Sequence, residues 1–186
     1  MTRSEVIVLG VDPGLASFGW GAVRLFPKLE RIVRVEVIKT KPSPKKLKVL
    51  AADDTSRRAR ELATTLREVI TRFKPVVIAA EAYSAPRHAS SAGKLNRAWG
   101  VLDGLTVEFS LPLVQTSPQA IKKLLCEDAS ASKAQVQAAL ELRYDRQFQS
   151  FVERSPKGDL EHGFDAVGAV VACLDSDVIL MARGML

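Results

Sequence analysis

The chain has 186 residues, of which 47% are hydrophobic and 26% charged, and its length suits a single globular domain spanning residues 1–186. It has no apolar run of 18 residues, which argues against a membrane span, and its two cysteines lack the spacing of a metal site or disulfide framework, which favours the cytoplasm. The net charge of +6 indicates a polyanionic partner, either nucleic acid or a membrane surface.

The first third of the chain predicts three strands. Residues 5–11 form a nearly continuous apolar run that ends at the turn signal DPG, residues 12–14. Residues 18–25 and 31–39 are rich in valine and isoleucine, and the second of these stretches alternates apolar with charged residues, as a half-buried strand does. Their short connections predict an antiparallel meander.

A helix and a parallel strand are expected next. Residues 40–48 are rich in proline and lysine and lack periodicity, so a solvated, disordered tract is one interpretation of them. Residues 54–56 offer N-caps for an amphipathic helix that runs to Phe73. Residues 76–80 form a short buried strand, which we expect to be parallel to the first because a helix crosses between them.

The second half of the chain predicts four more helices and one strand. The helices are expected at residues 88–108, 119–125, 133–143 and 164–174, and the strand at 111–115. Ser117 and Ser132 are the expected N-caps of the two middle helices. The order of elements matches an α/β protein of the ribonuclease H-like fold, with a five-stranded mixed sheet flanked by helices.

Three acidic residues follow or interrupt apolar segments. Asp12 and Glu81 end the first and fourth strands, and Asp165 is expected in the first turn of the last helix, three residues after His162. If the two strands are neighbours, Asp12 and Glu81 emerge side by side at one edge of the sheet. Taken singly, each has a structural interpretation, as a turn residue, a surface charge, a residue favoured by the helix dipole or a solvent-facing histidine.

Together, these carboxylates would have a chemical use. Clustered carboxylates raise one another's pKa unless a cation neutralises them, and Mg²⁺ or Mn²⁺ suits such oxygen ligands. Two ions about 4 Å apart can position an attacking water and stabilise the leaving oxygen of a phosphodiester. The residues therefore indicate a metal-dependent nuclease.

The motifs also resemble those of RuvC-type Holliday-junction resolvases. The resemblance rests on GVDPGL followed by GWG near the start, VIAAE ending at Glu81, SPQAIKK from residue 117, SKAQVQ from residue 132, and HGFDA from residue 162. It implies a homodimer that cuts opposed strands of a four-way DNA junction with Mg²⁺ or Mn²⁺, in which a branch-migration helicase is a conceivable partner. Carried over by position, it implies Asp12, Glu81, His162 and Asp165 as the catalytic and metal-binding residues.

The resemblance and the positive charge also suggest residues that hold DNA. Lys122 and Lys133 match lysines that the family uses near the DNA backbone, and Arg87, Lys94 and Arg97 are further candidates for phosphate contacts. Lys41, Lys45, Lys46 and Lys48 are candidates as well, as the alternative to a solvated, disordered tract. Tyr83 could stack on an unpaired base or pack beneath the following loop. Trp99 is expected in core or dimer packing.

The chain departs from the family pattern in two places that matter. The fourth acidic position is His162, whose nitrogen suits Mn²⁺ better than Mg²⁺, and Glu161 beside it could act as an outer carboxylate. The basic stretch 39–48 looks inserted. Two alternatives therefore stay open: a broader nuclease for flaps and other branched DNA, and a junction-binding protein without activity.

Overall fold

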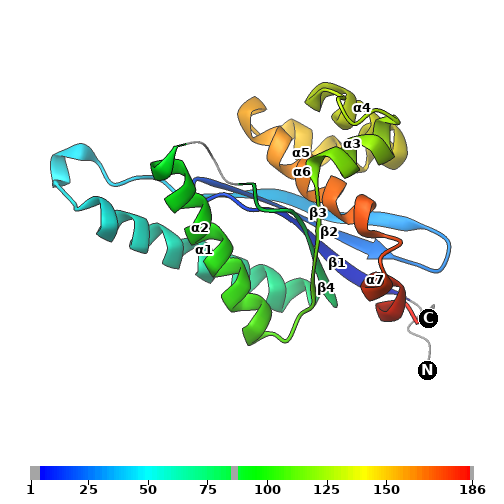
Figure 1. Ribbon diagram of the computed structural model, residues 1–186, viewed down its shortest axis with the longest axis horizontal. Coiled ribbons are helices and arrows are strands. Elements are labelled where there is room, and N and C mark those ends of the chain that lie inside the picture. The colour runs from blue at the N-terminus through cyan, green and yellow to red at the C-terminus, as the bar shows by residue number, and fades with distance from the viewer. Residues whose placement is uncertain (1–4, 85–87, 185–186) are drawn as a thin grey trace.

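The computed structural model describes residues 5–84 and 88–184, which form a five-stranded mixed sheet with helices on both faces (Figure 1). The strand order is β3-β2-β1-β4-β5. The strands are β1 (Val6–Asp12), β2 (Ser17–Leu25), β3 (Glu30–Lys39), β4 (Val77–Glu81) and β5 (Leu113–Thr116). The first three pair antiparallel, whereas β4 is parallel to both β1 and β5. The predicted fold class and the parallel fourth strand are confirmed.

Two layers of helices cover the sheet. One layer consists of α1 (Ala51–Phe73) and α2 (Ala89–Glu108). The other contains α3 (Pro118–Cys126), α4 (Lys133–Tyr144), η2 (Asp145–Phe148), α5 (Gln149–Arg154) and α6 (Lys157–Cys173), with α7 (Asp177–Ala182) near the C-terminus. Successive side chains of a strand point to opposite faces, so Val8 of β1 packs in the core beneath α6 and Leu9 in the core beneath α1 and α2. No helix in this described part of the chain is long and apolar enough to cross a membrane.

The start of α1 differs from the prediction. The helix begins at Ala51, and its N-cap, Leu50, makes no side-chain cap. Asp54, which was expected to cap the helix, instead accepts hydrogen bonds from the backbone N and Oγ of Ser43 at 2.8 and 2.7 Å. Its carboxylate closes the segment between β3 and α1, which contains the short 3-10 helix η1 (Lys45–Leu47) and is therefore not a disordered tract.

The final long helix also begins earlier than predicted. α6 starts at Lys157, seven residues before Phe164, so the polar residues Lys157–Glu161 are helical as well. Asp165 therefore begins the third turn, and its expected position in the first turn was wrong. A first-turn dipole cannot explain a carboxylate there, since that effect fades within one turn. The predicted caps Ser117 and Ser132 are confirmed, each accepting from a backbone N–H of its helix.

Glycines bring α6 directly onto the sheet. A Cβ placed on Gly10 of β1 would lie 2.0 Å from the carbonyl oxygen of Ala166, and one on Gly19 of β2 would lie 2.0 Å from that of His162. The backbone of α6 thus rests on the backbones of β1 and β2. This close approach fixes the height at which His162 and Asp165 stand beside the ends of the strands.

Candidate active site

Two neighbouring strands carry Asp12 and Glu81 to the same edge of the sheet. Asp12 is the last residue of β1 and Glu81 the last of β4, and the parallel pairing of Val11 with Ala80 places them next to each other. From the other layer, His162 of α6 brings Nδ1 to 2.7 Å from Asp12 Oδ2. The predicted adjacency of the strand ends is therefore present, and α6 adds to it.

The crowding of carboxylates at this edge shifts the pKa of two of them. Burial, followed by repulsion from Asp165 and Asp12, raises the pKa of Glu81 to about 7. Burial and the charge of Asp12 raise the pKa of Asp165 to about 6. Glu81 and Asp165 are thus both repelled by the charge of Asp12, and the site carries negative charge that the protein only partly compensates.

Lys133, at the start of α4, supplies part of that compensation. Its Nζ lies 2.8 Å from Oε2 of Glu161 and 3.6 Å from Oδ2 of Asp165. Burial alone would lower the pKa of Lys133, but the hydrogen bond to Glu161 and the nearby carboxylates raise it instead. The hydrogen bond to Lys133 in turn lowers the pKa of Glu161. Lys133 is thus a firmly charged ammonium at the mouth of the site.

A cavity of about 150 Å³ adjoins the carboxylates. It is lined by Glu81, Pro118, Ile121, Lys122, Lys133, Val136 and Asp165. Lys122 also lowers the pKa of Glu81 through its charge, though less than burial raises it. The two lysines expected to face DNA therefore flank two of the expected catalytic carboxylates.

The contact with Asp12 favours the charged form of His162. The hydrogen bond to Asp12 raises its pKa, burial opposes this, and the charges of Asp12, Glu161 and Asp165 raise it further. In that form, Nδ1–H donates to Asp12, and the imidazolium neutralises the carboxylate that ends β1. A histidine at this position can thus take the place of a cation while no other cation is bound.

The donor set fits a divalent cation by its chemistry, although the side chains stand apart. Across residues 5–84 and 88–184, the His, Cys, Asp and Glu side chains do not form a ready-made ligand group of three or more. Two of these side chains contact other charged groups instead, because Asp12 is hydrogen-bonded to His162 and Asp165 lies near Lys133. Three carboxylates and an imidazole are nevertheless oxygen and nitrogen donors suited to Mg²⁺ or Mn²⁺.

The remaining predicted DNA contacts are distributed on and near α2. Lys94 and Arg97 are exposed on that helix, and Arg87 lies outside the described residues. Tyr83, two residues after Glu81, is 41% exposed and contacts Trp99 edge-on, with 6.4 Å between ring centroids. Trp99 itself is buried in the core, as expected.

Two supporting contacts were not predicted. Lys39, the last residue of β3, pairs with Asp159 in the first turn of α6 and bonds Ser17 Oγ at 2.9 Å, which ties the helix to the sheet edge. Beneath the turn that follows Asp12, the buried Arg58 donates from Nε to Oγ1 of Thr40 at 2.9 Å. No sequence signal identified Asp159, because its segment had the composition of a loop.

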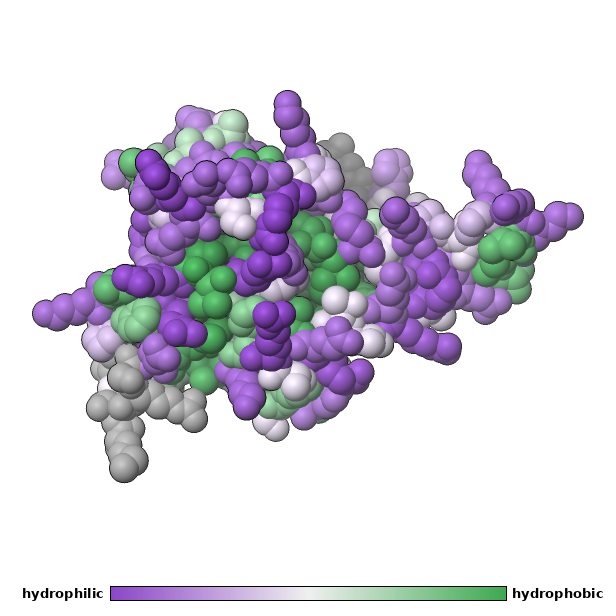
Figure 2. All heavy atoms as spheres, turned by 180° about the vertical axis from the view of Figure 1, so that it is seen from behind, coloured by the Kyte–Doolittle hydropathy of each residue, from purple (hydrophilic) through white to green (hydrophobic). Residues whose placement is uncertain are grey.

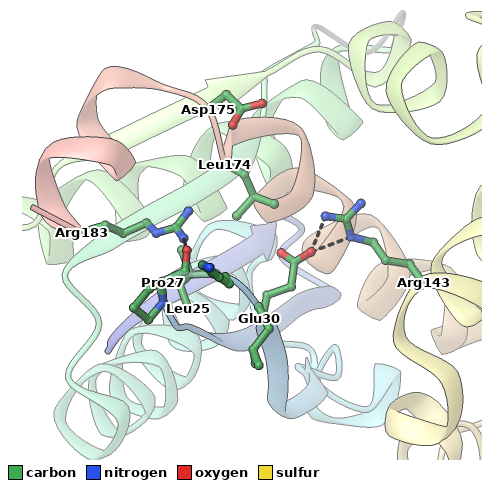
Figure 3. A pocket seen from close by; sticks show the side chains of 9 residues that line it. Leu25, Pro27, Glu30, Arg143, Leu174, Asp175 and Arg183 are labelled. Atoms are coloured by element: carbon green, nitrogen blue, oxygen red, sulfur yellow. Dashed lines mark hydrogen bonds and ion pairs between the residues drawn. The ribbon is translucent and has the colours of Figure 1, made fainter. Parts of the chain in front are cut away.

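A cavity of about 310 Å³ lies at the opposite end of the strands (Figure 3). Its lining includes Leu25, which pairs with Val6 at the start of β1, the strand end farthest from Asp12. Within the cavity, Glu30 pairs with Arg143, and Arg183 donates to the carbonyl oxygen of Phe26. Glu30 and Arg143 thus neutralise each other, and the cavity lies far from the carboxylates of β1 and β4, so it is not the candidate active site.

Comparison with known proteins gives a consistent family match. Residues 8–144 match the family model described as Crossover junction endodeoxyribonuclease RuvC. Proteins of that name from Orientia tsutsugamushi and Photobacterium profundum are 27% and 31% identical over 137 and 131 residues. The first alignment covers 74% of this chain and 80% of the relative, and the second covers 70% of each. The family match includes Asp12, Glu81, Lys122 and Lys133 and ends before α6.

Solved structures show the same fold over nearly the whole chain. Thermus thermophilus RuvC superposes with a TM-score of 0.69 at 23% identity, covering 96% of this chain and 97% of that one. A structure of T. thermophilus RuvC in complex with a Holliday junction substrate gives a TM-score of 0.70, covering 97% of both chains. The yeast mitochondrial Holliday junction resolvase gives 0.61 at 14% identity, covering 98% and 82%.

Proposed function

Because the chain belongs to the RuvC family of crossover junction endodeoxyribonucleases, we propose that it resolves four-way DNA junctions by divalent-metal-dependent hydrolysis of phosphodiester bonds. The observation that supports this proposal is that Asp12, Glu81 and Asp165, contributed by two parallel strands and α6, lie at one edge of the sheet, where charge repulsion raises the pKa of Glu81 and of Asp165. A fold alone would not require acidic side chains to crowd together there.

In this proposal, each residue of the cluster has a separate role. Asp12, Glu81 and Asp165 hold Mg²⁺ or Mn²⁺, two ions in each site, and His162 adds a nitrogen donor once its proton has left. Such ions lower the pKa of a bound water and stabilise the leaving oxygen of the phosphodiester. The raised pKa values of Glu81 and Asp165 fit this role, because uncompensated carboxylates favour a bound cation.

The lysines hold the substrate. Lys133 stands beside Asp165, so its ammonium can neutralise the phosphate whose bond is cut, and Lys122 extends the positive charge along the same cavity. Lys94, Arg97 and Arg87 continue this proposed phosphate contact on and before α2. The exposed fraction of Tyr83 leaves its ring free to stack on an unpaired base at the crossover.

The proposed homodimer follows from the symmetric cutting of two opposed DNA strands. We propose that residues 1–186 form one domain, that two copies form a homodimer which nicks two opposed strands, and that the protein works in the cytoplasm. Both described cysteines are free, Cys173 being buried, which fits that compartment. Partnership with a branch-migration helicase is part of the same proposal.

The direct test uses the purified protein and a four-way junction labelled on each strand in turn. We expect paired nicks on opposed strands in Mg²⁺ or Mn²⁺ and none in EDTA. Flaps, forks and RNA–DNA hybrids, tested side by side, should be cut at least about tenfold more slowly. Equal cutting of those substrates would mark a broader nuclease, and tight binding without cutting in either metal would mark a non-catalytic junction-binding protein.

A further inference from the structure

The segment between β3 and α1 presents a surface that the carboxylate site does not use. We call residues 41–50 the basic tip. All of its residues except Ser43 are exposed, among them Lys41, Lys45, Lys46, Leu47, Lys48, Val49 and Leu50. The apolar ones are well exposed, Leu47 by 60% and Leu50 by 71%. Figure 2 shows a hydrophobic cluster surrounded by hydrophilic side chains at the protruding end of the molecule, where Figure 1 places this segment.

The basic tip is held in shape by its own hydrogen bonds. The Asp54 carboxylate accepts from the backbone N and Oγ of Ser43, and these bonds, together with Arg57, lower its pKa to about 2. Arg57 of α1 also donates to the carbonyl oxygen of Lys41 and to Asp54, so its guanidinium ties the start of the tip to α1. Lys48 closes η1 in the left-handed region, with φ of 47°. The tip is therefore a preformed projection.

The charge of the basic tip is largely uncompensated. In the part of the chain that the structure describes, none of its four lysines forms an ion pair. The nearest acids along the chain are Asp53 and Asp54, and Arg57 already pairs with the second. Four free ammonium groups around three exposed apolar side chains complement a polyanion that also offers apolar surface. Duplex DNA has both, in its phosphates and in the sugar edges of its minor groove.

The basic tip extends from the edge of the sheet that carries the carboxylates. β3 ends at Lys39, which pairs with Ser17 at the start of β2, and the backbone N–H of Thr40 donates to the carbonyl oxygen of Ala16. Asp12 ends β1 at this same edge. Five residues lie between Lys39 and Lys45, so the Cα of Lys45 lies at most about 20 Å from that of Lys39 at this edge. That reach corresponds to about half a turn of duplex, or roughly five base pairs.

We propose that the basic tip binds backbone phosphates of the duplex arm that leaves the cutting site, about five base pairs from the cut, with Leu47 and Leu50 against the sugar edges of the groove. This inference rests on the proposed function, because it takes the DNA to be bound at the carboxylate edge. It gives residues 41–50 a role as a second, sequence-independent contact with the substrate. A fixed contact at that distance sets the direction in which the arm leaves the site.

The test measures binding in EDTA, so that it does not depend on cutting. The affinity of the full chain for a labelled four-way junction is followed against salt concentration for the wild type, for Lys45→Gln with Lys46→Gln, and for the control Lys28→Gln with Lys74→Gln. The control lysines are exposed and lie at the other end of the strands. We expect the tip variant to lower the slope of log K against log salt by nearly 2, at about 0.9 for each lost phosphate contact, and the control to leave it unchanged.

Two further measurements locate the contact. Neutral methylphosphonates placed about five base pairs from the crossover should lower the slope for the wild type and remove the difference between it and the tip variant. Leu47→Ser with Leu50→Ser should weaken binding several-fold at every salt concentration without changing the slope. An unchanged slope in the tip variant, or an equal loss in the control, would overturn the inference. A wild type that binds junctions with the expected slope but never cuts them would refute the proposed function and leave the tip contact standing.

Discussion

Nδ1 of His162 lies 2.7 Å from Oδ2 of Asp12 and joins the second turn of α6 to the end of β1. The contact places an imidazole among three carboxylates, and the hydrogen bond to Asp12 raises its pKa. In the protonated form, His162 must lose a proton before its nitrogen can bind a metal ion, which couples metal affinity to pH. An imidazole nitrogen is also a donor that binds transition metals more readily than it binds Mg²⁺.

Replacing His162 by aspartate should shift the metal preference. An all-oxygen donor set favours Mg²⁺, so we expect the ratio of the cutting rate in Mn²⁺ to that in Mg²⁺ to fall by about tenfold in His162→Asp. The measurement compares initial rates on one junction at saturating concentrations of each metal. An unchanged ratio would mean that His162 does not bind the metal and serves only to orient Asp12.

Asp12→Asn should abolish cutting while leaving DNA binding intact. The change removes a negative charge at the centre of the cluster with almost no change in shape. Loss of even an outer partner of a metal ligand commonly costs 10- to 100-fold, so we expect a fall of more than about 100-fold in the nicking rate. Affinity for the junction in EDTA should stay within about twofold of the wild type. Undiminished cutting by this variant would remove Asp12 from the proposed catalytic set.

The metal-free protein should lose stability as the pH rises through the acidic range. The folded-state pKa values of Glu81 and Asp165, about 7 and about 6, lie above those of unfolded carboxyls. The folded state therefore binds more protons between about pH 4 and 7, and the free energy of unfolding falls over that window. Glu81→Gln should raise the stability at pH 7.5 by on the order of 1 kcal/mol, allowing for solvent screening.

That stabilisation has two internal controls. At pH 4, Glu81 is protonated in the folded state, so Glu81→Gln should change the denaturation midpoint little. Millimolar Mn²⁺ should stabilise the wild type at pH 7.5 more than the variant, because binding to the native state adds stability. Urea denaturation in EDTA at several pH values gives the curves. A wild type whose stability rises steadily from pH 4 to 7 would contradict the mutual repulsion of these carboxyls.

Two glycine substitutions should change the free energy of unfolding in opposite directions. In Gly19→Ala, the new Cβ would lie 2.0 Å from the carbonyl oxygen of His162, so α6 must move away from β2 at a cost of about 1–3 kcal/mol or more. In Gly104→Ala, within α2, nothing lies within 4 Å of the new Cβ, and the helix should gain about 0.5–1 kcal/mol. Chemical denaturation of both variants checks the signs, and Gly19→Ala should also slow cutting by displacing His162. Equal effects would show that α6 does not rest on Gly19.

Much of the fold and the centre of the site could be predicted from local patterns. Asp12 and Glu81 were identifiable because each ends an apolar strand, and a helical crossover makes those strands parallel neighbours. Ser117 and Ser132 could be predicted as helix N-caps because side-chain capping depends on a few adjacent residues. Information of this kind lies within a short stretch of chain.

The rest depended on contacts between distant segments. The first turns of α6 are polar, and they are helical because Lys39 of β3 pairs with Asp159 and glycines of β1 and β2 receive the helix backbone. Asp54 was predicted as a cap, but Ser43 eleven residues earlier takes its carboxylate instead. These partners cannot be read from periodicity, because each is chosen by the packed structure.

The turn that follows Asp12 depends on the buried pair of Thr40 and Arg58. Oγ1 of Thr40 donates to the carbonyl oxygen of Leu15 and accepts from Nε of Arg58, which is 5% exposed. Thr40→Val keeps the shape of the side chain but leaves both partners without this hydrogen bond in the interior. A buried polar group without a partner costs about 1–3 kcal/mol, so we expect a loss of that order in the free energy of unfolding.

The same variant should lower the cutting rate, because Leu15 lies three residues from Asp12 and a looser turn lets the Asp12 carboxylate move. The control is Thr65→Val on α1, whose hydroxyl donates only to the carbonyl oxygen of Glu61 in its own helix. Thr65→Val should change stability by less than about 0.5 kcal/mol and leave cutting unchanged. Urea denaturation and single-turnover cutting of a junction measure both effects. If Thr40→Val were destabilised but cut at the wild-type rate, the pair would support the fold without positioning Asp12.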